Sequence, residues 1–211
     1  MIIAIESASS DRSLALASQD GVAFASDGWA SDGRQASELL PRLLVLLARA
    51  GRDLREVTAL AVGVGPGSFT GLRVSMSLAK GIALALRVPV VGIPSLEAWL
   101  EAEPRAAAAI ARAGAQDAYL LSRGASQPRM VAASDLRGLV GGSVLSASSE
   151  LALAFDLSDT LTPQEAAAAV ARLAATRLGL DPGGDDLAGL EPWYLRAPRG
   201  VPAPETVSGW P

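Results

Sequence analysis

The 211-residue sequence contains no cysteine and no histidine, and aromatic residues make up only 4% of it. The absence of cysteine excludes disulfides, thiolate nucleophiles and zinc–thiolate sites. The absence of histidine excludes Ser-His-Asp and Cys-His catalysis and any imidazole metal ligand. General acid or base chemistry is therefore left to Asp, Glu, Tyr and the single lysine, Lys80.

The sequence also lacks a basic charge excess and a long apolar run. Its formal net charge is −4. This argues against a protein that binds nucleic acid without a partner, because phosphate binding needs a basic face. The first residues, Met1 to Glu6, carry no basic region of the kind that opens a signal peptide. The most apolar stretch, Val74 to Val91, is interrupted by charge and falls short of the ~20 residues of a membrane span. We therefore expect a cytoplasmic protein that contacts no membrane.

Alanine and leucine supply most of the apolar content. In the first hundred residues, apolar runs and turn signals predict three strands in an antiparallel meander, followed by alternating helices and strands. The expected strands are 2–5, 14–17, 22–25, 58–64 and 89–92, and the expected helices are 36–50, 72–86 and 96–101. This order is typical of a ribonuclease-H-like lobe, the half-unit of actin-like ATPases.

The best boundary between two lobes is the segment Glu103-Pro104-Arg105. We assign residues 1–103 to the first lobe, 104–196 to a second lobe, and 197–211 to a Pro- and Gly-rich tail. The second half gives weaker signals, with strands expected at 106–111, 118–122 and 130–133. A helix is expected from Thr162 to Gly179. Thr162 would be its N-cap, with a proline at the first helical position and a glutamate three residues after the cap.

The most specific segment is a glycine-rich loop that joins an expected strand to an expected helix. Such a loop can present backbone N–H groups to a phosphate at a helix N-terminus. It lacks the Gly-Lys pair of a P-loop. A G-x-G-x-x-G pattern read from Gly63 or from Gly65 has Ser68 or Thr70 where the last glycine belongs. The alternative is a tight turn whose glycines permit close helix packing. We favour this structural role for Gly65, Gly67, Ser68, Thr70 and Gly71.

Two further patterns give weak indications of chemistry. Ser77 and Lys80 match the S-x-x-K element of penicillin-binding enzymes, but the companion K-T-G element needs a second lysine. The turn from Glu6 to Asp11 offers acidic and hydroxyl side chains, as actin-like ATPases do where they hold metal-bound nucleotide phosphates. A metal site needs several converging oxygens, and no second cluster is evident. We interpret the segment as a polar hairpin turn and predict no catalytic residue and no metal site.

The first long helix is apolar around more of its circumference than one sheet covers. A surface helix shows an apolar stripe of roughly 100°, whereas leucines here occupy more than half of the circumference. A helix buried between a sheet and a neighbouring helix would explain this, as would a helix that meets a partner subunit. The expected helix at 72–86 also carries apolar residues among small ones, which favours the interpretation that the two helices meet a partner subunit. The predicted partner-binding residues are Leu39, Leu40, Leu43, Leu46, Leu47, Leu72 and Met76.

Several segments carry a family signature. The run Gly65-Pro66-Gly67-Ser68-Phe69-Thr70-Gly71-Leu72-Arg73 is highly specific. The supporting segments are Ile3 to Ser7, Ser37 to Pro41, Lys80-Gly81 with Pro94 to Ala98, and Pro192 to Arg196. Together they resemble the bacterial TsaB (YeaZ) family over nearly the whole chain. The resemblance implies an α/β, two-lobed actin-like (ASKHA, ribonuclease-H-like) fold whose second lobe is smaller and degenerate.

The resemblance also implies a subunit that does not catalyse by itself. Members of this family pair with TsaD, and with the ATPase TsaE, to place threonylcarbamoyl on the adenosine beside the anticodon of tRNA, from a donor that another enzyme makes. The two apolar helices would form the TsaD-binding face or an alternative homodimer face. The chain would have no cofactor of its own, with ATP or ADP an option at the complex interface, and tRNA would be reached only through the complex.

The sequence departs from the family pattern at two places. Ala36 stands where family members usually have histidine, and the second lobe keeps only Asp117 and Tyr119 of a longer family stretch. Two rival functions stay open. One is an actin-like enzyme that hydrolyses or transfers a nucleotide phosphate, which would need carboxylate metal ligands in both lobes. The other is a peptidase, which would depend on Ser77 and Lys80.

Overall fold

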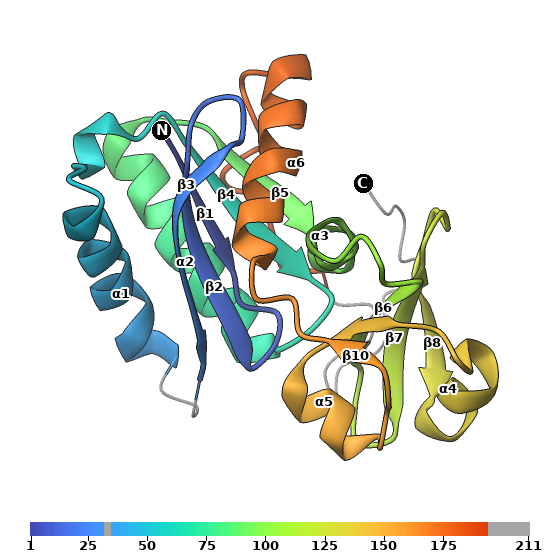
Figure 1. Cartoon of the computed structure of the whole chain (residues 1–211). Helices are drawn as coiled ribbons and strands as arrows, with labels where there is room; N and C mark the ends of the chain where they lie inside the picture. Colours follow the sequence, from blue (N-terminus) through green and yellow to red (C-terminus); the bar gives the residue numbers. More distant parts are fainter. Residues whose placement is uncertain (32–34, 194–211) are drawn as a thin grey trace.

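The computed structural model of the chain describes residues 1–31 and 35–193, with the side chains of all of these except 35 and 36. Two lobes lie side by side, each built on a five-stranded sheet (Figure 1). The strands are β1 (Ile2–Glu6), β2 (Asp11–Ala17), β3 (Ala23–Ala30), β4 (Ala59–Gly65), β5 (Val90–Pro94), β6 (Ala108–Arg112), β7 (Asp117–Ser122), β8 (Arg129–Ala132), β9 (Leu145–Ala147) and β10 (Thr160–Leu161).

The two sheets share one topology. The first has the order β3-β2-β1-β4-β5 and the second the order β8-β7-β6-β9-β10. In each sheet the first three strands form an antiparallel meander, and the last two join in parallel beside the first strand of the meander. This repeated pattern, shorter in the second lobe, confirms the two-lobed actin-like, ribonuclease-H-like fold.

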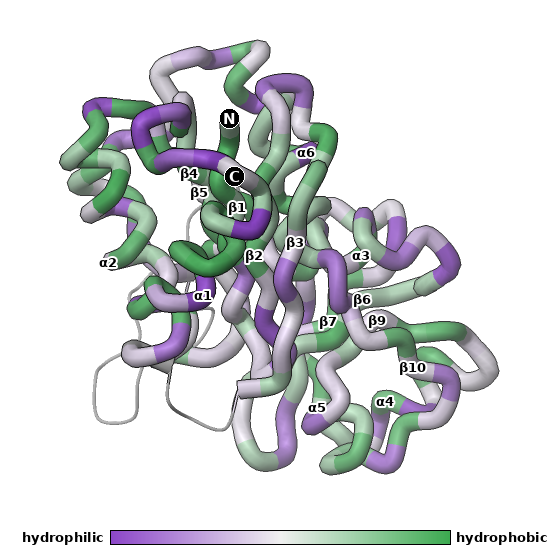
Figure 2. The backbone as a smooth tube through the Cα atoms, turned by 60° about the vertical axis from the view of Figure 1, so that its left-hand side comes forward, coloured by the Kyte–Doolittle hydropathy of each residue, from purple (hydrophilic) through white to green (hydrophobic). Residues whose placement is uncertain are grey.

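Helices cover both faces of the first sheet. The helices are α1 (Gln35–Arg49), α2 (Phe69–Leu86), α3 (Ser95–Ala102), α4 (Ala133–Val140), α5 (Ser149–Ala154) and α6 (Ala166–Leu180), with a 3-10 turn at Leu54–Glu56. Successive residues of a strand point to opposite faces. Accordingly, Ile3 and Ile5 of β1 pack toward α1 and α2, whereas Ile2 and Ala4 pack toward α6. Figure 2 shows α1 and α2 next to each other on their side of the sheet.

The position of α6 corrects the predicted extent of the second lobe. Residues 104–196 were assigned to that lobe, but α6 lies on the first sheet, against β1, β2, β4 and β5 (Figure 1). Its alanines, Ala167, Ala169 and Ala171, are fully buried there. The approach is close, because a Cβ on Gly21 would lie 2.8 Å from the Cα of Arg172. The second lobe therefore ends before α6, and the predicted tail at 197–211 lies outside the described residues.

The segment after α6 lies along the edge of the first sheet. The N–H of Asp185 donates to the carbonyl oxygen of Val90 at 2.8 Å, and the Asp185 carboxylate accepts from the N–H of Gly92 at 2.6 Å. Arg177 of α6 donates to the same carboxylate at 2.6 Å. Farther along, the N–H of Trp193 donates to the carbonyl oxygen of Val64 at 2.7 Å. This segment therefore covers the β5 edge of the sheet.

The remaining differences concern short elements and element ends. β3 extends through residues predicted as loop, because Ser26 to Ala30 pair with β2. The last helix begins at Ala166 rather than directly after Thr162, because a turn comes first, in which the N–H of Gln164 donates to the carbonyl oxygen of Thr162 at 2.8 Å. Within the described residues, α2 alone is long and apolar enough by length and composition to cross a membrane. Here it packs on β4 and α1, with Ser75, Met76, Ala79 and Ala83 among its buried residues.

Candidate functional site

Six of the seven predicted partner-binding residues are part of the chain's own core. Four leucines of α1 pack into the cluster formed with β1 and β2, Leu72 packs beside Trp99, and Met76 is buried in α2. Leu40 alone is exposed, at 42% of its surface. The prediction is therefore wrong for these six, because the apolar arc of α1 faces the sheet and α2 rather than a partner. The six are Leu39, Leu43, Leu46, Leu47, Leu72 and Met76.

An exposed apolar surface remains on the other side of the same two helices. Leu44 is 47% exposed and Leu84 of α2 is 68% exposed. On α2, two small residues that precede Leu84 in the chain, Ser77 and Gly81, are exposed as well. We call this surface the outer face and define it by Leu40, Leu44 and Val45 of α1 with Ser77, Gly81 and Leu84 of α2. The sequence signal for it was the spacing of four between Leu40 and Leu44, which places them on one ridge.

The glycine-rich loop is clamped onto the turn between β1 and β2. The N–H of Ser68 donates to the carbonyl oxygen of Ala8 at 2.7 Å, and its hydroxyl caps α2 by accepting from the N–H of Gly71 at 3.2 Å. A Cβ on Gly67 would lie 2.2 Å from the Ala8 carbonyl oxygen. Gly65 has a φ of +102°, a conformation that favours glycine. Backbone shape thus accounts for glycine in this loop.

The acidic residues at the same turn do not converge. Glu6 is buried, and its Oε1 accepts from the N–H of Ala8 at 2.7 Å. Its Oε2 has no hydrogen-bond partner among the described residues, and burial raises the pKa of Glu6 to about 7. The Oδ2 of Asp11 instead accepts from the N–H of Ser149 at 2.7 Å, across the gap to the second lobe. The described residues contain no group of three acidic side chains that would hold a metal ion.

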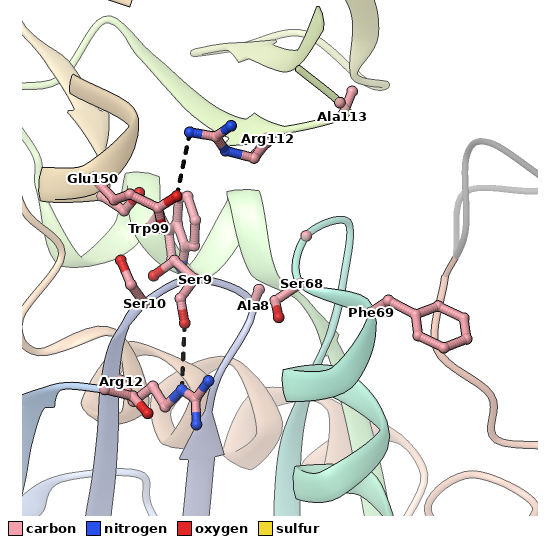
Figure 3. Close-up of a pocket in the computed structure, with 14 residues that line it drawn as sticks. Ala8, Ser9, Ser10, Arg12, Ser68, Phe69, Trp99, Arg112, Ala113 and Glu150 are labelled. Atoms are coloured by element: carbon pink, nitrogen blue, oxygen red, sulfur yellow. Dashed lines mark hydrogen bonds and ion pairs between the residues drawn. The ribbon is translucent and has the colours of Figure 1, made fainter. Parts of the chain in front are cut away.

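A cleft of about 480 Å³ lies between the lobes (Figure 3). The wall on the side of the first lobe includes Ser9, Ser10 and Arg12, the first residues of α2, and Trp99 of α3. The opposite wall includes Arg112, whose guanidinium pairs with Glu150 at 3.3 Å. Neither Arg12 nor Trp99 was among the predicted site residues, because neither belongs to a recognisable motif and both line a cleft whose opposite wall comes from the second lobe.

The Ser77 and Lys80 pattern and the second-lobe residue Tyr119 are not arranged for catalysis. Ser77 lies on the outer face, whereas the Nζ of Lys80 donates to the carbonyl oxygen of Ala188 at 3.4 Å. Tyr119 is buried in the cluster between the lobes, with Trp99. The side chain of Ala36 and residues 194–196 lie outside the described residues. The peptidase alternative therefore has no Ser–Lys pair set up in the described structure.

Comparison with known proteins places the chain in a family. Residues 33–157 match the family model described as TsaD, tRNA N6-adenosine threonylcarbamoyltransferase. The chain belongs to this family. Among its curated relatives are proteins named tRNA threonylcarbamoyladenosine biosynthesis protein TsaB, which bear out the resemblance to the TsaB (YeaZ) family.

Three relatives show how far the TsaB (YeaZ) similarity extends. TsaB of Escherichia coli is 41% identical over 58 residues, 28% of this chain and 25% of that protein. TsaB of Haemophilus influenzae is 45% identical over 64 residues, 30% of this chain and 27% of that protein. The matches thus span about a quarter of each curated relative. The solved structure of YeaZ from Pseudomonas aeruginosa matches the fold with a TM-score of 0.67 over 92% of this chain and 99% of that one, at 22% identity.

Proposed function

We propose that the chain acts in tRNA threonylcarbamoyladenosine biosynthesis as a non-catalytic subunit. In this proposal its outer face binds a TsaD partner, TsaE joins the complex, and the adenosine next to the anticodon is modified by the partner. Membership of the TsaB (YeaZ) family supports the pathway. The proposal places the chain in the cytoplasm, away from membranes, and in contact with tRNA only through the complex.

The observation that carries the partner role is the outer face. The inner sides of α1 and α2 pack on the sheet, yet Leu44 of α1 and Leu84 of α2 stay exposed, and the two helices contact each other. Exposed apolar patches of this kind mark protein–protein contacts. A second copy of the chain is the alternative occupant of the same face.

The non-catalytic role rests on the chemistry of the described residues. Catalysis of group transfer needs a positioned base, nucleophile or metal. Here Glu6 is buried, Asp11 is bound to Ser149, and the sequence has no histidine or cysteine. The same facts weigh against the alternative of an actin-like nucleotide-hydrolysing enzyme. The proposal includes no cofactor of the chain's own, with ATP or ADP at the interface with the partner.

A reconstitution tests this function. Purified chain is incubated with tRNA, ATP, magnesium and threonylcarbamoyl-adenylate, with or without TsaD and TsaE from the same host, and modified adenosine is measured by mass spectrometry of digested tRNA. We expect modification only when TsaD is present, and more of it when this chain is added. Turnover by the chain alone that Glu6→Gln abolishes would support the enzyme alternative instead.

A further inference from the structure

The helices that form the outer face expose charge of one sign. Among the exposed residues of α1 and α2 whose side chains the structure describes, the charged ones are Arg49 and Arg73, and none is acidic. Arg49 follows Val45 by four residues and Arg73 precedes Ser77 by four, so each lies on the same helix ridge as a residue of the outer face. The two arginines therefore share the solvent-exposed surface of the apolar patch.

The two arginines lie at opposite ends of this surface. α1 leads from β3 to β4 and α2 leads from β4 to β5, and these three strands run in the same direction. Both helices therefore run back along the sheet in parallel, next to each other (Figure 1). Arg49 is the last residue of α1, whereas Arg73 lies near the start of α2. A guanidinium group thus stands near each end of the outer face.

Neither guanidinium group is neutralised within residues 1–31 and 35–193. No carboxylate of these residues forms an ion pair with Arg49 or Arg73. Arg73 instead stacks on Phe69, with its guanidinium carbon 4.5 Å from the centroid of the ring, a contact that leaves the positive charge in place. Both positive charges are therefore available to a protein that approaches the outer face.

The carboxylates that border α1 are already occupied. Asp27 and Glu56 each pair with an arginine, at 3.0 Å and 2.9 Å. Asp53 caps the 3-10 turn by accepting from a backbone N–H at 2.8 Å. Glu38 is half-buried and accepts from a tryptophan and a serine side chain, each at 3.1 Å. Negative charge to match Arg49 and Arg73 must therefore come from the protein that binds.

A second copy of the chain cannot bring that negative charge. In a closed two-fold dimer the same surface of each subunit meets itself. Such a dimer would bring together the Arg49 and Arg73 of both copies, with no exposed carboxylate from the described residues of α1 or α2. Like charges that face each other across an interface oppose association and suppress the wrong partner. The charges therefore discriminate between the two candidate occupants of the outer face.

We infer that the outer face selects its partner by charge: it accepts an apolar surface with carboxylates at both ends and excludes a second copy of the chain. The inference rests on the proposed function, in which TsaD is the protein that meets this face. The attraction acts at the contact itself, because the chain as a whole has a net charge of −4 and physiological salt screens charges beyond about 8 Å. The carboxylates therefore belong to the part of TsaD that touches Arg49 and Arg73.

Sedimentation equilibrium of the chain alone tests the exclusion of a second copy. We expect the unaltered chain to be monomeric. The double variant Arg49→Gln with Arg73→Gln should self-associate about tenfold more strongly or more, because the neutral amides remove the repulsion between copies. A double variant that is as monomeric as the unaltered chain would overturn the inference, as would an unaltered dimer that Leu44→Asp dissociates.

Surface plasmon resonance with TsaD from the same host tests the attraction. The double variant Arg49→Glu with Arg73→Glu should lower the association rate constant about tenfold or more, because the partner's carboxylates then meet like charge. The control is Arg105→Glu with Arg129→Glu, which makes the same change of charge at two exposed arginines away from α1 and α2. We expect the control to associate with TsaD as fast as the unaltered chain does.

Leu44→Asp separates a failure of this inference from a failure of the proposed function. If Leu44→Asp weakens TsaD binding but the Arg49→Glu, Arg73→Glu variant associates as fast as its control, TsaD meets the outer face without carboxylates and the inference alone fails. If TsaD binds all of these variants equally, the proposed surface and the inferred attraction both fail. If the charge-reversed variant binds TsaD normally but the complex loses affinity for tRNA, the arginines contact RNA phosphates instead, which also overturns the inference.

Discussion

The Oδ2 of Asp11 accepts a 2.7 Å hydrogen bond from the N–H of Ser149, so the first residue of β2 satisfies the first turn of a helix in the other lobe. The hydroxyl of Ser149 also lies 3.5 Å from Asp11 Oδ1. The N–H groups that begin a helix have no partner within it, and a carboxylate is a strong acceptor for them. Asp11 therefore joins the two lobes, which gives a structural reason for an acidic residue at this turn.

Removing this link should destabilise the chain modestly. Asp11→Ala should lower the free energy of unfolding by about 1 kcal/mol, the usual loss when a helix cap is removed. Asp11→Asn keeps an acceptor oxygen without the charge and should lose less. Urea unfolding measures the effect, and amide hydrogen exchange at Ser149 locates it. Unchanged exchange at Ser149 in Asp11→Ala would show that the contact does not hold the lobes together in solution.

Glu6 should make stability fall as the pH rises. Its pKa in the folded chain is raised to about 7 by burial, whereas 4.5 is the ordinary value for glutamate. The unfolded chain therefore loses this proton first, and the folded state is penalised progressively between about pH 4.5 and pH 7. The full penalty above pH 7 is about 3 kcal/mol at most.

Glu6→Gln should remove this pH dependence. The amide oxygen can still accept from the N–H of Ala8, and the side chain no longer ionises. We expect the variant to gain stability relative to the unaltered chain as the pH goes from 5 to 8, measured by urea unfolding at each pH. At pH 4.5 the unaltered chain should be at least as stable. Parallel stability profiles of the two proteins would mean that Glu6 titrates at an ordinary pKa.

Gly67 of the glycine-rich loop can be compared with Gly81 of α2, which serves as a control for the same substitution. A Cβ on Gly67 would meet the carbonyl oxygen of Ala8 at 2.2 Å, so Gly67→Ala must displace backbone and should destabilise the chain by a few kcal/mol. A Cβ on Gly81 has no neighbour within 4 Å, and Gly81→Ala should be neutral or stabilise α2 by up to about 1 kcal/mol. Thermal unfolding compares them. Equal melting temperatures would leave the loop's glycines without a packing role.

The first lobe could be predicted from the sequence because its signals are local. The run Ile2 to Ile5 and the Asp20-Gly21 turn mark strands and a hairpin without reference to anything distant. The strands β9 and β10 could not be predicted, since segments of three and two residues show no period. The helix start near Thr162 could be detected in the sequence. The sheet that α6 covers could not, because its buried face consists of alanines, which would pack against either sheet.

The candidate site was harder to predict for a geometric reason. The leucines of α1 occupy a wide arc, and the sequence does not state which part of it meets the sheet. The structure turns Leu43 and Leu47 inward and leaves Leu44 outside, one residue away. Arg12 and Trp99 carry no motif, and the cleft that they line exists only because the second lobe supplies its opposite wall.

The outer face yields the prediction that bears most directly on the proposed function. Leu44→Asp places a charge on an exposed position of α1, so it should leave the fold intact, as circular dichroism would show. An unpaired charge buried at the centre of an interface typically weakens binding by 2 kcal/mol or more, which is about thirtyfold. We therefore expect Leu44→Asp and Leu84→Asp to weaken binding to TsaD by about that factor in titration calorimetry.

Two variants serve as controls for this surface. Leu153→Asp introduces the same charge at a position of α5 that is 83% exposed and lies in the other lobe, and it should not change the affinity for TsaD. Leu43→Asp, by contrast, buries the charge in the chain's own core and should unfold it. If Leu44→Asp and Leu84→Asp both fold and bind TsaD as tightly as Leu153→Asp does, the partner surface is not on α1 and α2.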